Sequence, residues 1–385
     1  MGRVARTLAL LLVGLAAAPT GAQEGFGART PIEDPSGHAL DAFHASLAAG
    51  RRTRVMVWGA SHTAEDRFTG YLRDALQARY GDGGPGLVMP ARPFELYDHR
   101  GVAIAEQGAW TLLRVNGRQR EHDRYGPAGF AIEARGPAVA RVQPARPTRS
   151  ARVFFLEQPG GGRLEVRVGS AAPITLRTRG DRATSRLLAP PDGVSEVSLR
   201  ARGDGPVRLF GVSLENDPGR GVIVDAMGVP GARIRDRLPW DDPAMRRSLS
   251  ELAPDLIVLA YGTNETGFTQ RRLSLYRREI DEALRRARAM TPRASCLVVG
   301  PSDWPLRHPD GSFAVRERTA QIVAIQRDAA ARHGCGHYDL VAFMGGPLSM
   351  PRWVDAGLAA PDYVHFTDEG HQILARRLLE ALALP

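Results

Sequence analysis

The sequence predicts an α/β fold, a doubly wound parallel sheet interrupted by an inserted antiparallel β-sandwich. Three observations support this prediction. Near-continuous apolar runs alternate with helical patterns at both ends of the chain, as in sheets covered on both faces. Residues 100–218 instead show short alternating runs between Gly/Pro/Asp clusters. The length of 385 residues suits one large domain with additions, or two domains.

The first α/β part, residues 23–99, begins with a helix whose apolar face is Leu40, Phe43 and Leu47 and which stops at Gly50. A buried strand follows at 54–58. Phe68, Leu72, Ala75 and Leu76 then recur at helical spacing, and "YGDGGPG" ends that helix.

The insertion, residues 100–218, contains the runs "RLEVRV", "ITLRT", "VSEVSLRA" and "PVRLFGVSL", separated by clusters such as "QPGGG" and "APPDG". Alternation of this kind is typical of strands with one solvent-exposed face. We therefore expect a sandwich that interrupts the α/β domain between its first and second strands.

The second α/β part, residues 219–385, resumes the strand and helix alternation. Strands are predicted at "GVIVDAMG", "LIVLAYG", "CLVVGPSDW" and "CGHYDL", and helices at 268–290, 315–333 and 368–383. The sequence shows no internal repeat.

The N-terminus has the pattern of a secretory signal. Arg3 and Arg6 precede the apolar run "LALLLVGLAAA" and then "TGA", which predicts a signal peptide over residues 1–22 with cleavage after Ala22. No later segment reaches the roughly 20 apolar residues of a membrane helix. We expect an exported protein, periplasmic or secreted, with an uncleaved N-terminal tether as the alternative.

The charge is basic, at +9, and every basic residue other than histidine is arginine. The arginines are scattered, without the basic block or stripe that nucleic-acid binding requires, so no nucleic-acid partner is expected. The charge supports at most a mild preference for an anionic polymer.

The two cysteines, Cys296 and Cys335, each open an apolar run, so they are placed at the same ends of neighbouring parallel strands. Either a disulfide or two buried thiols fits an exported protein. They do not form a zinc site by themselves, and no histidine cluster accompanies them. No metal and no cofactor are expected.

Polar residues follow four of the predicted elements where a doubly wound sheet has its ligand crevice, outside the carboxyl ends of its strands. They are Ser61, the "GVPG" turn ending at Gly231, Asn264 in "YGTNE", and Asp362 with His365 in "DYVH". Taken singly, each is ordinarily a helix cap or a turn former.

Together these residues suit ester cleavage. A serine hydroxyl becomes nucleophilic when an imidazole takes its proton, and a carboxylate fixes the tautomer of that imidazole. Ser61, His365 and Asp362 supply these groups. The backbone N–H groups of Ser61 and Gly231 and the amide of Asn264 supply three donors for the oxyanion of acyl transfer.

The blocks "GASHTAED", "GVPGA", "YGTNE" and "DYVH" resemble, in that order, blocks of the SGNH (GDSL-type) hydrolase superfamily, which has a flavodoxin-like sheet. The resemblance covers residues 24–99 and 219–385. It implies Ser61 as nucleophile, Asp362 and His365 as its triad partners, and Ser61, Gly231 and Asn264 as the oxyanion hole.

A narrower resemblance, carried by "IEDPSG", the run from "SHTAED" to "GLVMP" and the β-rich insertion, is to exported peptidoglycan O-acetylesterases, in which the insertion resembles a carbohydrate-binding module. The family usually has Asp where this chain has Ala60, and Glu65 or Asp66 is a candidate substitute for it. His62 is expected to pack or hydrogen-bond structurally, and His371 to be an ordinary helix residue.

The leading hypothesis is a serine esterase that removes O-acetyl groups from an envelope polysaccharide, with peptidoglycan as the expected polymer. An O-acetyltransferase with the same triad and a non-catalytic wall-binding protein are the alternatives. Asp303 and Trp304, after the strand "CLVVGPS", are candidates for lining the substrate groove, or simply cover the core. The sequence does not predict the oligomeric state.

Overall fold

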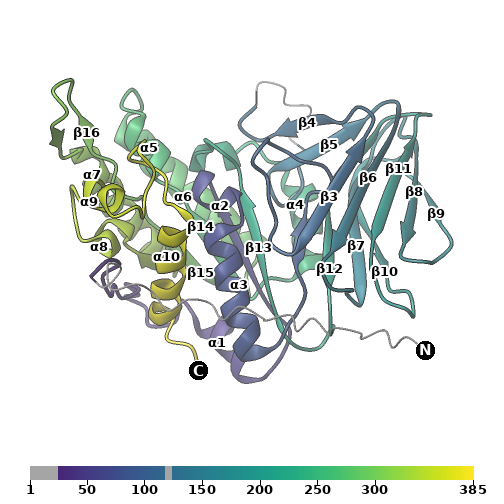
Figure 1. Cartoon of the computed structure of the whole chain (residues 1–385), viewed down its shortest axis with the longest axis horizontal. Helices are drawn as coiled ribbons and strands as arrows, with labels where there is room; N and C mark the ends of the chain where they lie inside the picture. Colours follow the sequence, from purple (N-terminus) through teal and green to yellow (C-terminus); the bar gives the residue numbers. More distant parts are fainter. Residues whose placement is uncertain (1–24, 118–123) are drawn as a thin grey trace, which may run out of the picture.

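The computed structural model describes residues 25–117 and 124–385, so the predicted signal peptide over residues 1–22 lies outside the described residues. Figure 1 shows two parts side by side, an α/β part and a β-sandwich. The α/β part is built on a five-stranded parallel sheet in the order β13-β1-β14-β15-β18. These strands are β1 (Thr53–Gly59), β13 (Val222–Gly228), β14 (Leu256–Ala260), β15 (Ser295–Val299) and β18 (Gly336–Tyr338).

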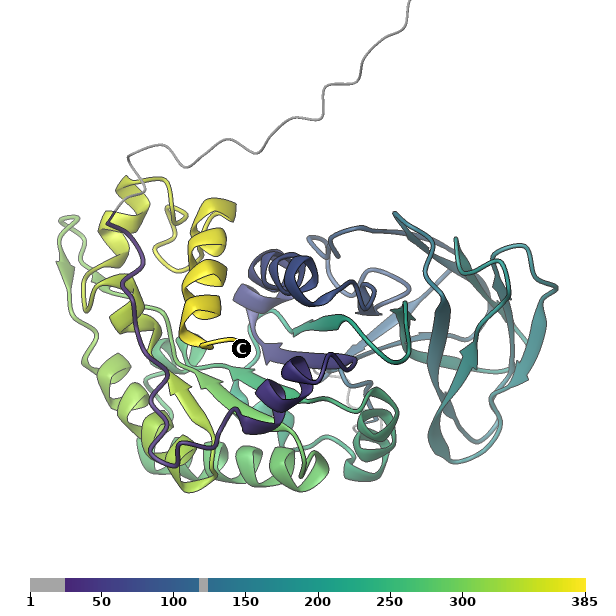
Figure 2. The same cartoon turned by 90° about the horizontal axis from the view of Figure 1, so that it is seen from below.

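Helices cover both faces of this sheet, as Figure 2 shows. On one face lie α1 (Asp41–Ala48), α3 (Arg67–Tyr80), α8 (Leu340–Met344), α9 (Met350–Asp355) and α10 (Asp368–Ala381), whose apolar side chains share one buried cluster. On the other face lie α4 (Asp242–Leu252), α6 (Leu273–Met290) and α7 (Glu317–Arg332). Three short helices complete this part, α2 (Ser61–Ala64), the 3₁₀ helix η2 (Ile234–Arg237) and α5 (Thr263–Gly267). The doubly wound prediction is confirmed.

The insertion forms two antiparallel sheets. One has the order β10-β7-β12-β5-β4, with β2 paired to β12, and the other has the order β3-β6-β11-β8-β9. The first comprises β2 (Gly86–Val88), β4 (Thr111–Arg114), β5 (Phe130–Ala134), β7 (Ser150–Glu157), β10 (Arg182–Leu188) and β12 (Val207–Glu215). The second comprises β3 (Val102–Gln107), β6 (Pro137–Pro144), β8 (Arg163–Val168), β9 (Ile174–Arg177) and β11 (Val197–Arg202). A separate hairpin joins β16 (Leu306–Arg307) to β17 (Phe313–Ala314).

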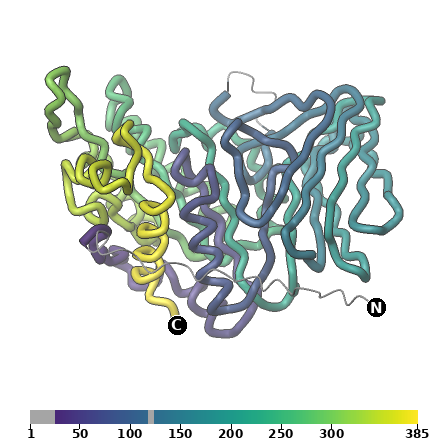
Figure 3. Tube along the Cα trace, in the orientation of Figure 1, coloured from purple at the N-terminus to yellow at the C-terminus, as the bar shows by residue number. Residues whose placement is uncertain are grey.

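The sandwich interrupts the α/β domain between its first two strands in sequence, because β1 and β13 are neighbours in the parallel sheet. The tube in Figure 3 follows the chain out of α3 into the sandwich and back to β13. Strand β2 precedes residue 100 and already pairs with β12. Buried side chains from both parts, such as Trp58 and Phe130, belong to one apolar cluster, so the two parts share a core.

The disulfide Cys296–Cys335 joins β15 to the start of β18, two neighbouring parallel strands. Of the alternatives that the sequence leaves open, the structure therefore has the disulfide. Among the residues described, no helix has the length and apolar character needed to cross a bilayer.

Four histidines are buried, at least in part, and have lowered pKa values: His62, His99, His337 and His371. Burial, which disfavours the charged ring, is the main cause and brings the pKa of His62 and His337 to about 4. An unfolded chain takes up these protons near pH 6.5, whereas the folded chain does not. The contribution of these neutral rings to the free energy of unfolding is therefore fully present above pH 6.5 and is lost as the pH falls toward 4. Glu265, whose pKa burial raises to about 7, has the opposite effect.

The variant His337→Phe isolates one of these groups. Between pH 6.5 and 4, its free energy of unfolding is expected to fall by about 3 kcal/mol less than that of the unmodified chain, because one proton-linked loss is removed. Urea unfolding at the two pH values measures this difference. Equal losses in both proteins would show that His337 is not held neutral by the fold.

Candidate active site

The turn that carries Ser61 is compact because two glycines pair at the ends of neighbouring strands. Gly59 of β1 lies opposite Gly228 of β13. A Cβ atom on Gly228 would lie 2.3 Å from the backbone nitrogen of Ala64, so only glycine lets α2 approach the sheet this closely. Ser61 is the first residue of α2, where backbone N–H groups have no partner within the helix.

Ser61, His365 and Asp362 form a continuous hydrogen-bonded chain. Ser61 Oγ lies 2.9 Å from His365 Nε2, and His365 Nδ1 lies 2.6 Å from Asp362 Oδ2. With the Nδ1 proton directed to the carboxylate, Nε2 is free to accept the hydroxyl proton of Ser61. Figure 1 shows that α2 and the loop before α10 lie at the same edge of the sheet.

Asp362 also holds the loop that carries His365. Its Oδ1 accepts the backbone N–H groups of Val364, at 2.9 Å, and of His365, at 3.0 Å. Tyr363 between them has a φ of 60°, in the left-handed region, which closes this tight turn. Burial by itself would raise the pKa of Asp362, but the hydrogen bonds from His365 and Val364 outweigh it and lower that pKa. The carboxylate is therefore ionised at neutral pH.

The hydrogen-bonded triad of Ser61, His365 and Asp362 is accessible from solvent. The side chains of His365 and Asp362 are 45% and 48% exposed. An acyl group carried by a bulky polymer can therefore reach the Ser61 hydroxyl without entering a closed cavity.

Gly231 and Asn264, the two other predicted oxyanion donors, lie on segments that hydrogen bonds hold at the end of the sheet that carries Ser61. The N–H of Val229 donates to the Gly59 carbonyl, which anchors the "GVPG" turn beside the Ser61 turn. Gly231 in this turn has a φ of 73°, a conformation that favours glycine. Asn264 Nδ2 donates to the carbonyl of Ala232, the next residue, at 3.0 Å. The structure thus brings Gly231 and Asn264 together.

Glu265 is a residue of this edge to which the sequence assigned no role. Its two oxygens accept the N–H groups of Ile234, at 2.7 Å, and Gly262, at 3.1 Å. Burial raises the pKa of Glu265 to about 7, while the hydrogen bond from the Ile234 N–H acts in the opposite direction. Glu265 therefore fixes the position of the neighbouring Asn264 relative to the segment after Gly231.

Asn116 is a second such residue and comes from the inserted sandwich. Its Nδ2 donates to the carbonyl of Pro230 at 2.9 Å, directly before Gly231. Nothing in the local pattern around Asn116 predicts this contact, because it depends on how the sandwich packs against the α/β part.

The structure gives Asp303 and Trp304 contacts within the protein. Asp303 is buried, and its Oδ2 accepts the N–H of Met350 at 3.0 Å, at the start of α9. Arg316 lies over the ring of Trp304, 4.7 Å from its centroid. Their role in binding substrate stays a prediction.

Asp66 holds the segment after the Ser61 helix, while Glu65 pairs with Arg67 on the surface. Asp66 is buried and accepts hydrogen bonds from Arg73, Thr69 and the N–H of Arg100. Burial tends to raise its pKa, yet the charge of Arg73 is among the contacts that bring it below the usual value. Asp66 thus anchors the segment that follows the Ser61 turn.

His62 connects the Ser61 helix to the loop of His365. Its Nε2 lies 2.9 Å from the carbonyl of Val364, which agrees with the structural role expected from the sequence. Burial and the neighbouring His365 lower the pKa of His62 to about 4, so at neutral pH its ring is uncharged and Nε2 carries the donated proton. The ring of His371 packs nearby, with centroids 6.1 Å apart.

Replacing His62 with leucine is expected to lower kcat on a small ester by roughly tenfold to a hundredfold, because a loop that has lost its tether misplaces the imidazole. The variant His62→Gln keeps an amide donor for the Val364 carbonyl and should recover most of the rate. KM should change little in either variant. Equal activity of the leucine and glutamine variants, measured by steady-state hydrolysis, would argue against this role.

Within residues 25–117 and 124–385, no group of three or more His, Cys, Asp or Glu side chains is arranged to hold a metal ion.

Residues 191–373 match the model of the GDSL-like lipase/acylhydrolase family. No curated protein matches the chain. The solved structure of a peptidoglycan O-acetylesterase is similar at a TM-score of 0.75 with 24% identity, covering 91% of this chain and 97% of that one. This likeness shows a common fold.

Two further solved structures score lower. A family two carbohydrate esterase from Cellvibrio japonicus has a TM-score of 0.30 with 11% identity, over 73% of this chain and 99% of that one. An acetyl xylan esterase has a TM-score of 0.33 with 17% identity, over 42% and 81%. Scores this low support no conclusion about this chain. The match of residues 191–373 to an acylhydrolase family and the shared fold agree with the resemblance to SGNH (GDSL-type) hydrolases found in the sequence.

Proposed function

We propose that this chain is a serine esterase that removes O-acetyl groups from an envelope polysaccharide, with peptidoglycan as its substrate. The observation that carries the proposal is the hydrogen-bonded chain from Ser61 Oγ through His365 to Asp362. The likeness in fold to a peptidoglycan O-acetylesterase along nearly the whole chain, the sandwich included, supports the choice of polymer.

In the proposed reaction, His365 Nε2 takes the proton of Ser61 as the hydroxyl oxygen attacks the acetyl carbonyl. The N–H groups of Ser61 and Gly231 and the Asn264 amide stabilise the oxyanion that forms. His365 then protonates the departing sugar oxygen, which leaves an acetyl ester on Ser61. A water molecule, deprotonated by His365, attacks this ester and releases acetate, and the proton returns to Ser61.

The proposed setting is the bacterial envelope outside the cytoplasm. Residues 1–22 act as the signal peptide in this proposal. The disulfide between Cys296 and Cys335 supports it, because disulfides persist chiefly in oxidising compartments. The exposed site supports a polymeric substrate, since His365 and Asp362 are almost half accessible.

The test compares three esters with the full chain: O-acetylated peptidoglycan, acetylated xylan and a long-chain nitrophenyl ester. Acetate release is measured by ion chromatography, and acetyl transfer to an added glycan is measured by mass spectrometry. We expect acetate to be released fastest from peptidoglycan, without transfer. Faster release from xylan would refute the choice of polymer, faster cleavage of the long-chain ester would indicate a lipase, and acetylated acceptor would indicate a transferase.

A further inference from the structure

The outer face of the sheet β3-β6-β11-β8-β9 is open to solvent. Along each strand, residues alternate between the core and this face. Ala140, Val142, Val166 and Leu199 are buried in the sandwich core, so the residues between them point outward.

Arginine dominates the outward positions of these strands. We call the following six residues the arginine face: Arg141 on β6, Arg163 and Arg167 on β8, Arg177 on β9, and Arg200 and Arg202 on β11. Within these strands, all of which are described, Glu165 is the one acidic residue at an outward position. The whole chain has 51 basic and 42 acidic residues, so the arginine face is far more basic than the chain in general.

Half of these arginines lack an ion-pair partner. Arg163 pairs with Asp204, and Arg200 and Arg202 pair with Glu165. In the described part of the chain, no ion pair is formed by the other three, Arg141, Arg167 and Arg177.

The strand register sets the separation between two of the unpaired charges, those of Arg141 and Arg167. Ser198 lies opposite Arg141 on one side and opposite Arg167 on the other. The two guanidinium groups are therefore carried by strands two positions apart, about 10 Å by the usual strand spacing. Two positive charges at this separation suit a polymer with repeated anionic groups.

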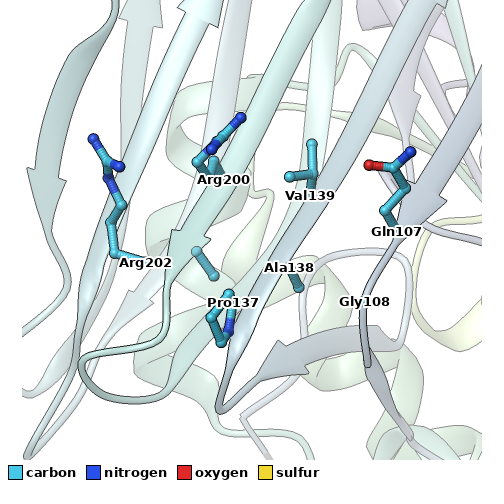
Figure 4. Close-up of a pocket in the computed structure, with 8 residues that line it drawn as sticks. Gln107, Gly108, Pro137, Ala138, Val139, Arg200 and Arg202 are labelled. Carbon is cyan, nitrogen blue, oxygen red and sulfur yellow. The ribbon is translucent and has the colours of Figure 1, made fainter.

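A hollow of about 330 Å³ lies at one end of the arginine face. Figure 4 shows the side chains of Arg200 and Arg202 on one side of it and the Gln107 amide on the other. Guanidinium groups bind carboxylates in a two-pronged manner, and an amide hydrogen-bonds to hydroxyl groups. A sugar that carries a carboxylate offers a carboxylate to the guanidinium groups and hydroxyl groups to the amide.

The outward positions carry no aromatic residue in any of these five strands, all of which are described. Stacking of a neutral sugar ring on an aromatic side chain is therefore not available there. The large apolar side chains that are exposed in the described structure, such as Leu96 and Leu306, lie outside these strands, so the face offers no side chain of that kind for insertion into a membrane.

We propose that the arginine face binds the carboxylate groups of an anionic polysaccharide by charge. Its link to the esterase substrate rests on the proposed function, whereas binding to an anionic glycan does not. Bound in this way, the polymer is kept at high local concentration at the surface of the protein, which is the effect expected of a surface with a single sign of charge.

The test measures binding of polygalacturonate, an anionic glycan without acetyl groups, by titration calorimetry at low and high salt. The variant Arg141→Gln/Arg167→Gln removes two unpaired charges, and Arg51→Gln/Arg293→Gln removes two exposed charges from the α/β part as the matched control. We expect binding that weakens with salt and that becomes about tenfold weaker in the first variant, with little change in the control.

Unchanged affinity in Arg141→Gln/Arg167→Gln, equal weakening in the control, or no binding by the unmodified chain would overturn the proposal. Tighter binding to vesicles of anionic lipid than to polygalacturonate would assign the face to a membrane surface instead. Because the probe carries no ester, its binding is independent of catalysis. Hydrolysis of a small ester should be the same in both variants, so failure of this proposal is distinguishable from failure of the esterase proposal.

Discussion

The Ser61→Ala variant is expected to lose at least about 10⁴-fold in kcat on acetyl esters, because alanine has no atom that can carry the acetyl group. His365 and Asp362 keep their mutual bond in this variant, since that bond does not involve Ser61. The fold should also persist, because within the described structure the Ser61 hydroxyl hydrogen-bonds only to His365.

Hydrolysis of nitrophenyl acetate and the thermal unfolding midpoint are measured together. Ser349→Ala is a matched control, since Ser349 is a buried serine whose hydroxyl has no partner among the described residues. The control should retain its rate within a few-fold. A Ser61→Ala protein that is folded and hydrolyses the ester within tenfold of the unmodified rate would exclude Ser61 as nucleophile. In the active protein, an acetylated Ser61 peptide should be trapped by acid quenching and detected by mass spectrometry.

The second large effect concerns stability, at a buried ionic network between the two parts of the molecule. Arg54 of β1 is 1% exposed and donates to both oxygens of Asp225 on β13, at 2.8 and 3.1 Å, and to Glu215 of β12. These carboxylates draw the pKa of Arg54 above its usual value, although burial acts against them. Since β12 belongs to the sandwich, Arg54 joins the parallel sheet to the insertion.

The variant Arg54→Met is expected to lower the free energy of unfolding by about 3–5 kcal/mol, because two buried carboxylates lose their counter-ion. Adding Asp225→Asn should restore part of this loss, since the neutral amide needs no cation while its oxygen still accepts the N–H of Leu87. Urea unfolding, with its slope compared between proteins, measures these differences.

Arg52 provides the control for this network. It also pairs with Glu215, at 2.7 Å, but its side chain is 26% exposed and Glu215 keeps Arg54. The variant Arg52→Met should therefore cost no more than about 1 kcal/mol. A loss in Arg54→Met that is no larger than that in Arg52→Met would contradict the role assigned to the buried network.

The helices and strands of the α/β part were predictable because their signals are local. The strand at 54–58 appears as β1, and the apolar spacing of Phe68, Leu72 and Leu76 appears as the buried face of α3. Ala75 shares that spacing but is exposed. The buried face includes Arg73 instead, since its charge is neutralised by Asp66.

Other elements had weaker local signals. The long helix predicted at 268–290 begins only at Leu273, because the chain first completes the short helix α5. Helix α4 was not predicted, although Asp241 caps it by accepting the N–H of Ala244 and proline follows at its start. Strand β2 has only three residues, so it is defined by pairing with β12 rather than by any periodicity of its own.

The sequence by itself determined the layered α/β plan, the interruption by a sandwich and the presence of polar residues after the strands, because alternation, helical spacing and glycine turns are properties of neighbouring residues. Only the tertiary structure decided which distant side chains and backbone groups contact one another. Arg54 reads as an ordinary surface residue at the start of a strand until β12 and β13 bring two carboxylates to it. Asn116 likewise reaches the turn of Gly231 only through the packing of the sandwich. Contacts between segments more than a hundred residues apart depend on strand order and register, which no local pattern encodes.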